Sequence, residues 1–162
     1  MSLQLPNGRI TIYFSLVLAL VLTIMPLPSV VSAWRPTWVL LVLLYWTLAL
    51  PHRVNVGHAW VLGLLQDVLL GAPLGVHALS FSLACYVFAL NFQRFRNFSI
   101  WQQSLLVGVI CLLHQLLRFW AAYLFDDVAL TSGILYPVFS SMVLWPWIFL
   151  LLRKTRRRFK VR

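Results

Sequence analysis

The sequence predicts an all-α polytopic membrane protein: a bundle of six transmembrane helices with both termini in the cytoplasm. Three observations lead there. First, 62% of the 162 residues are hydrophobic and only 10% are charged, whereas soluble domains are about 25% charged. Second, the apolar runs are long enough to cross a bilayer. Third, the basic residues gather on one side of the expected spans. We therefore expect a single transmembrane domain over residues 1–162, with no extramembranous part large enough to fold alone.

The apolar runs and the breaks between them set the expected helices. Pro26 and Pro28 mark where the first helix should end. The second and third runs are near the short limit for a span, and tight connections at 51–53 and 71–75 predict helical hairpins. Pro146 should kink the sixth helix. The expected helices cover residues 10–31, 34–50, 54–70, 74–92, 100–125 and 134–152, followed by a basic cytoplasmic tail over 153–162.

A cleavable secretory signal is the alternative for the first run, because Val31-Ser32-Ala33 resembles a small-residue cleavage site. The weakly basic head and the long apolar run argue against cleavage. Cleavage would leave five spans in the same orientation.

Basic residues orient the spans. Of the 13 lysines and arginines, Arg118 lies within the fifth run and Arg35 lies on the outer side of the membrane. All the others fall on the cytoplasmic side when the N-terminus is inside, as the positive-inside rule requires. These eleven are Arg9, Arg53, Arg94, Arg96, Arg153, Lys154, Arg156, Arg157, Arg158, Lys160 and Arg162.

Asp67 is the one carboxylate within an apolar segment, since the other acidic residues, Asp126 and Asp127, lie together in an expected loop. A charge in lipid is costly and should face protein or a cavity. Gly63, Asp67 and Gly71 are four residues apart and share a helix face. Small residues allow close helix approach, and a buried carboxyl can hydrogen-bond across it. We interpret this face, with Gly75 beyond it, as a helix-packing seam. The alternative is that it lines a ligand pocket.

Arg118 is the second intramembrane charge. Asp67 and Arg118 both fall in the outer half of their helices by the rise per residue, which suggests that they pair or share a hydrated pocket. The competing interpretation is that Arg118 reaches the outer headgroups. We interpret His114, one turn earlier, as a packed hydrogen-bonding histidine.

No catalytic residues, metal ligands or cofactors are predicted. The remaining histidines, His52, His58 and His77, lack the local spacing of a metal site, and Cys85 and Cys111 fit as small packing residues. No nucleophile stands in a recognisable arrangement with a histidine and a carboxylate, and there is no glycine-rich phosphate loop. We expect neither an enzyme nor a nucleic-acid-binding protein.

The basic tail has three compatible interpretations. It fixes topology, it holds anionic lipid headgroups, or it docks an acidic cytoplasmic partner. The residues concerned are Arg153, Lys154, Arg156, Arg157, Arg158, Lys160 and Arg162.

Three blocks carry a family resemblance: the segment from Arg35-Pro36-Thr37-Trp38 to Tyr45-Trp46, the segment Leu50-Pro51-His52-Arg53-Val54-Asn55-Val56-Gly57, and the pattern Gly63-x3-Asp67-x3-Gly71-x2-Leu74-Gly75. The chain resembles the rod shape-determining protein MreD family over nearly its full length, most closely the proteobacterial branch. His114, Gln115 and Arg118 match no family motif.

The resemblance implies a non-enzymatic subunit of the bacterial cell-wall elongation complex in the inner membrane. Such a subunit would bind MreC and connect MreB filaments to RodA and a penicillin-binding transpeptidase. Arg35, Pro36, Trp38 and Arg53 are then candidates for partner contact. The family is also similar to the substrate-binding subunits of energy-coupling-factor transporters. A vitamin-type solute-binding subunit, with Asp67, His77, His114 and Arg118 around an outward pocket, is the alternative function.

Overall fold

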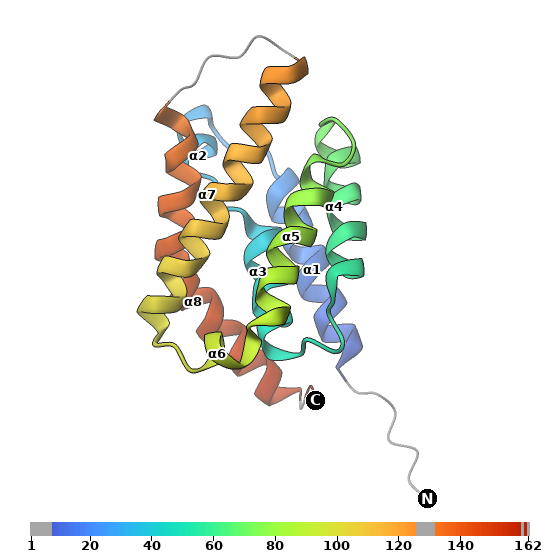
Figure 1. Ribbon diagram of the computed structural model, residues 1–162, viewed down its shortest axis with the longest axis vertical. Coiled ribbons are helices and arrows are strands. Elements are labelled where there is room, and N and C mark those ends of the chain that lie inside the picture. The colour runs from blue at the N-terminus through green and yellow to red at the C-terminus, as the bar shows by residue number, and fades with distance from the viewer. Residues whose placement is uncertain (1–7, 126–131, 160, 162) are drawn as a thin grey trace, which may run out of the picture.

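The computed structural model describes residues 8–125, 132–159 and 161, and these form a bundle of helices with no strand among them (Figure 1). Six long helices run up and down the bundle. They are α1 (Arg9–Ile24), α3 (Trp38–Ala49), α4 (Val56–Leu70), α5 (Val76–Leu90), α7 (Ile100–Phe125) and α8 (Leu135–Arg158). Three short elements, α2 (Ser29–Ala33), α6 (Phe92–Arg96) and the 3₁₀ turn η1 (Ser132–Ile134), lie in the connections. The all-helical prediction is confirmed for these residues.

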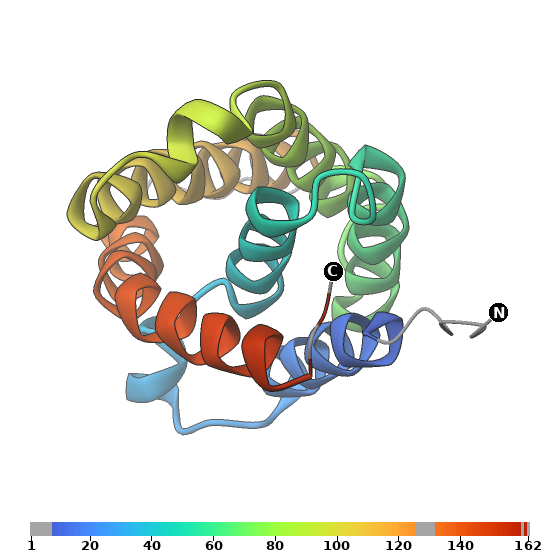
Figure 2. The ribbon, with the colours of Figure 1, turned by 90° about the horizontal axis from the view of Figure 1, so that it is seen from below.

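Helix α3 is the centre of the bundle, with the other long helices arranged around it (Figure 2). All ten residues from Val39 to Leu48 are buried, including Trp46 at 0% exposure. A helix that is apolar on every side suits a position with neighbours all round. Helix α3 packs on α1, α5 and α8, and the α4–α5 and α7–α8 hairpins form much of the surrounding wall.

Local sequence explains most helix ends. The first helix was expected over 10–31, but it ends at Ile24, because Pro26 lacks an N–H and disfavours helical geometry at Met25. After Pro28 a separate short helix, α2, begins, and Pro36 delays the start of α3 to Trp38. The Asn55 side chain accepts hydrogen bonds from the N–H groups of Gly57 and His58 and so caps α4.

The expected end of the last helix was wrong. The basic segment is not a separate tail, because α8 continues through Arg158, which places the arginines on its last turns. Pro146 lies inside α8, as expected, and the kink expected at this residue stays a prediction. In addition, α6 was not predicted, whereas the fifth expected helix, 100–125, matches α7.

The surface of the bundle is apolar and much of its polar content is inside. Trp120, Val143 and Trp147 are 68%, 67% and 72% exposed, whereas His114 and Ser141 are 3% and 0% exposed. Such a surface suits lipid, since soluble monomers rarely expose large apolar patches. Among the described residues, two segments are long and apolar enough to cross a membrane, Ile100–Phe125 and Ser132–Arg158. Helices α1, α4 and α5 are apolar but shorter.

The two ends of the described chain lie at one end of the bundle, the lower end in Figure 1, where Gly8 and Val161 are in contact. The connection from α3 to α4 and helix α6 lie at the same end (Figure 1). That end therefore carries Arg9, Arg53, Arg94, Arg96 and the arginines of α8.

Candidate functional site

The α4–α5 hairpin places Asp67 where one helix ends and the next begins. Gly71 follows α4 in the left-handed conformation, at φ 64°. The N–H of Ala72 donates to the Asp67 carbonyl at 3.0 Å, and the N–H of Gly71 donates to the Val68 carbonyl at 3.4 Å. This pair of bonds is a Schellman motif, which satisfies carbonyls at the end of a helix. The turn thus returns the chain beside the Asp67 side chain.

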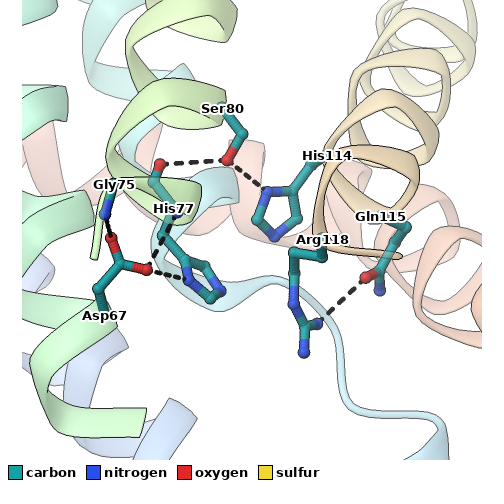
Figure 3. Close-up of polar contacts among 7 residues, drawn as sticks. All are labelled: Asp67, Gly75, His77, Ser80, His114, Gln115 and Arg118. Atoms are coloured by element: carbon teal, nitrogen blue, oxygen red, sulfur yellow. Dashed lines mark hydrogen bonds and ion pairs between the residues drawn. The ribbon is translucent and has the colours of Figure 1, made fainter. Parts of the chain in front are cut away.

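The Asp67 carboxylate caps the N-terminus of α5 (Figure 3). Its Oδ2 accepts from the Gly75 N–H at 2.9 Å, and its Oδ1 accepts from the His77 N–H at 3.1 Å. The N-cap residue Gly75 has no side chain for this task. The first N–H groups of a helix otherwise lack partners, and a negative charge there is favourable to the helix dipole. Asp67 therefore stabilises α5 from α4.

His77 completes the contact. Its Nδ1 lies 2.7 Å from Asp67 Oδ1. Because an ionised carboxylate only accepts, Nδ1 carries the proton and donates it. Asp67 is 0% exposed and His77 is 2% exposed. The carboxylate thus receives three hydrogen bonds within a dry setting, where an unpaired charge would be very costly.

The cluster reaches α7 through Ser80 (Figure 3). The Ser80 hydroxyl donates to the His77 carbonyl at 3.1 Å, which leaves its oxygen free to accept from His114 Nδ1 at 2.8 Å. The His77 and His114 rings lie 5.3 Å apart between centroids. A chain of polar contacts therefore joins α4, α5 and α7.

Arg118 does not pair with Asp67 in the structure, and that expectation is wrong for the described conformation. Asp67 is occupied by α5, while the exposed Arg118 donates through Nη1 to Gln115 Oε1 at 3.1 Å (Figure 3). Estimates of depth along separate helices did not reveal that the start of α5 lies between them. The alternative function had grouped His77 with Asp67 around a pocket, but it did not predict that His77 is the direct hydrogen-bond partner of Asp67.

The three glycines of the expected helix-packing seam have different roles in the structure. A Cβ at Gly63 would overlap the backbone of His77 and Ala78, so this glycine allows close α4–α5 packing. A Cβ at Gly71 or Gly75 would meet nothing, and both residues have positive φ, 64° and 102°. They serve the turn and not a helix contact.

The candidate partner-contact residues lie at both ends of α3. Arg35 donates from Nη1 to the Thr23 carbonyl and from Nη2 to the Met25 carbonyl, the latter at 2.6 Å. It therefore satisfies carbonyls at the C-terminal end of α1. Pro36 and Trp38 are half-buried at the start of α3, and Arg53 is half-buried in the connection to α4. Lys160 and Arg162 lie outside the described residues.

Further hydrogen bonds connect the central helix to its neighbours. The Trp46 indole N–H donates to Ser15 Oγ on α1 at 2.8 Å. At the start of α3, Thr37 Oγ1 lies 3.2 Å from Ser141 Oγ on α8 and 3.3 Å from Cys111 Sγ on α7. Cys111 is buried and free, in keeping with its interpretation as a packing residue.

The hydrogen bonds described above hold neighbouring helices together inside an apolar bundle. Comparison with known proteins shows which family has this sequence. Residues 6–155 match the family described as rod shape-determining protein MreD. The chain belongs to the MreD family. The rod shape-determining protein MreD of Haemophilus influenzae is 42% identical to it over 151 residues, which cover 93% of each chain. No solved structure matches the chain. The resemblance seen in the sequence is thereby confirmed, and an MreD-type role in cell shape follows.

Proposed function

We propose that the chain is a non-enzymatic scaffold of the bacterial cell-wall elongation complex. It crosses the inner membrane six times with both ends in the cytoplasm, binds MreC, and connects MreB filaments to RodA and a penicillin-binding transpeptidase. Family membership supports the role in cell shape. The lower end of the bundle, with its arginines, is the cytoplasmic end, in keeping with the positive-inside rule.

The hydrogen bonds of Asp67 are the main observation in favour of the scaffold function. A carboxylate that binds a solute or moves a proton must be reached by its ligand. Asp67 has 0% exposure, and its three hydrogen bonds go to Gly75 and His77 of the same chain. The buried charge of Asp67, which is costly to place in the bundle, thus serves to hold α4 against α5.

The α4–α5 hairpin also gives the proposal its mechanism. A scaffold needs a fixed arrangement of helix surfaces, and a buried, satisfied polar cluster favours one arrangement over others. Partner helices would then dock on the small-residue and aromatic parts of the outer surface, and the basic end would face cytoplasmic proteins.

The test is a mild-detergent pull-down of the tagged protein from its own membranes, with partners identified by mass spectrometry. We expect MreC together with RodA or the transpeptidase. Recovery of an ATPase module without these proteins would replace the scaffold with the vitamin-type transporter subunit.

Asp67→Asn sharpens this test. The amide keeps the size of the carboxyl but presents an N–H group to N–H donors of α5, so we expect reduced recovery of MreC and rounded cells. The matched control is Val68→Leu on the lipid-facing side of the same helix, where Val68 is 68% exposed; it should leave recovery and shape unchanged. Normal shape and recovery with Asp67→Asn would contradict the mechanism.

A further inference from the structure

A cavity of about 250 Å³ lies at the lower end of the bundle, where α3 ends and α7 begins. It is bounded by four elements, α3, α6, α7 and α8, from three separate parts of the sequence. Six polar or charged residues line it: Tyr45 on α3, Arg96 on α6, Gln103 on α7, and Arg153, Arg156 and Arg157 on α8. None of the described residues that line it is acidic.

Two of the lining residues are buried and have unpartnered polar atoms. Tyr45 is 2% exposed and Gln103 is 4% exposed. Within the described part of the chain, neither the Tyr45 hydroxyl nor Gln103 Oε1 makes a hydrogen bond. Buried polar atoms without partners are rare in folded proteins because each costs free energy. Their presence beside a hollow space indicates groups held ready for a ligand.

Both side chains are held in place by other contacts. The Tyr45 ring packs edge-on against Phe149 of α8, at 5.5 Å between centroids. Gln103 Nε2 donates to the carbonyls of Phe95 and Phe98, at 3.0 and 3.3 Å. Since these bonds fix which end of the amide carries nitrogen, Oε1 is an acceptor with nothing to accept.

The charges specify the class of ligand. Four guanidinium groups and a phenolic O–H are all donors, and arginine forks match the paired oxygens of phosphate. Gln103 Oε1 requires a donor, such as a hydroxyl of the phosphate ester or of a protonated phosphate. The volume is below the range of drug-sized pockets, which begins at about 300 Å³. These features fit a small phosphate group with a hydroxyl.

We propose that this cavity is a binding site for a phosphate-bearing ligand at the cytoplasmic face. The shared chemistry is a phosphate anion, supplied either by the headgroup of an anionic phospholipid such as phosphatidylglycerol or by a free phosphate compound. The site is defined by named side chains of four helices and goes beyond a general attraction of a basic surface for lipid. It does not depend on the scaffold function.

The experiment compares two sources of phosphate. The full chain is placed in nanodiscs of phosphatidylcholine, and thermal stability and ligand binding are measured with added phosphatidylglycerol, and separately with inorganic phosphate or glycerol 3-phosphate. Stabilisation by phosphatidylglycerol alone identifies a lipid site. Stabilisation by the soluble compounds identifies a free-phosphate site. Stabilisation by neither overturns the proposal, as does binding of an acidic peptide without either phosphate source.

Matched arginine variants separate the cavity from diffuse charge. Arg156→Gln removes a lining guanidinium, whereas Arg158→Gln removes the same charge from an exposed residue of α8 that does not line the cavity. We expect about tenfold weaker binding for Arg156→Gln and wild-type binding for Arg158→Gln. Equal losses in the two variants would mean that only the net charge attracts phosphate, and would overturn the site.

Tyr45→Phe removes one hydroxyl and keeps the ring that packs on Phe149. It should weaken binding several-fold while the protein remains folded. Unchanged affinity in Tyr45→Phe and Arg156→Gln together would show that the phosphate binds elsewhere.

Discussion

The Asp67 cluster and the cavity at the lower end of the bundle differ in whether their buried polar atoms have hydrogen-bond partners. In the α4–α5–α7 cluster, Asp67 is dry and its oxygens receive three hydrogen bonds. At the lower end, Tyr45 and Gln103 are also buried, but each has an atom without a partner beside a cavity. The difference teaches that burial of a polar side chain does not define its role. A satisfied group holds structure, whereas an unsatisfied group next to space is available to a ligand.

Removing the Asp67 carboxylate should disrupt the α4–α5–α7 cluster and have the largest effect on stability. In Asp67→Leu, the N–H groups of Gly75 and His77 and the ring of His77 lose their acceptor inside the bundle. We expect a loss of about 3–5 kcal/mol in the free energy of unfolding, because three buried N–H donors lose their acceptor at about 1–3 kcal/mol each. Denaturant titration in detergent measures it. Val68→Leu, at an exposed position of the same helix, should change it by about 0.5 kcal/mol or less, and a similar small value for Asp67→Leu would refute the role of the cluster.

A double-mutant cycle sharpens the assignment of partners. The cycle of Asp67→Asn and His77→Gln should give a coupling free energy of about 1–3 kcal/mol, because the two side chains share a hydrogen bond. The parallel cycle of Asp67→Asn and Arg118→Gln should give a coupling near zero, within about 0.3 kcal/mol. A larger coupling with Arg118 than with His77 would restore the pairing expected from the sequence.

The close approach of α4 and α5 predicts a cost for one added methyl group. In Gly63→Ala the new Cβ overlaps the backbone of Ala78, and backbone cannot rotate away as a side chain can. We expect a loss of about 1–3 kcal/mol in stability. Gly133→Ala is the control, since a Cβ there meets nothing. Equal thermal midpoints for the two variants would show that the helices separate at no cost.

The smallest effect on stability should come from a substitution in the cavity at the lower end of the bundle. Without phosphate or anionic lipid, Tyr45→Phe removes a buried hydroxyl that has no partner, so stability should stay constant or rise by up to about 1 kcal/mol. Thermal unfolding in phosphatidylcholine measures it. A loss of about 2 kcal/mol or more would show that the hydroxyl is part of the structure, and the contrast between the cluster and the cavity would fail.

The sequence predicted the position of a helix correctly where one local feature, such as a long apolar run or a proline, determines it. Helix α7 is a long, mostly apolar run without proline and was placed correctly. The break caused by Pro26 and Pro28 was also placed correctly, although the expected helix ran past it. The extent of α8 was misjudged because arginines are good helix formers, and their charge was interpreted as the end of a helix.

The site was predictable only in part. The cost of a charge in lipid singled out Asp67, but its partner depends on where the start of α5 lies in space. A signal for this was present: α5 begins after Leu74-Gly75, with no side chain able to cap it, nine residues after a carboxylate. The phosphate cavity gave no comparable signal, because Tyr45 sits in a uniformly apolar run and the other lining residues come from three separate elements.

The central position of α3 has a consequence for the order of assembly. Its N-cap, Thr37, hydrogen-bonds to Ser141 of α8, and Tyr45 packs on Phe149 of the same helix. Helix α8 is synthesised last among the long helices, about a hundred residues after α3. One side of the central helix therefore stays uncovered while the ribosome completes the chain. Each helix can form as it is synthesised, but the core of this protein closes only after synthesis of α8, when that helix packs against α3.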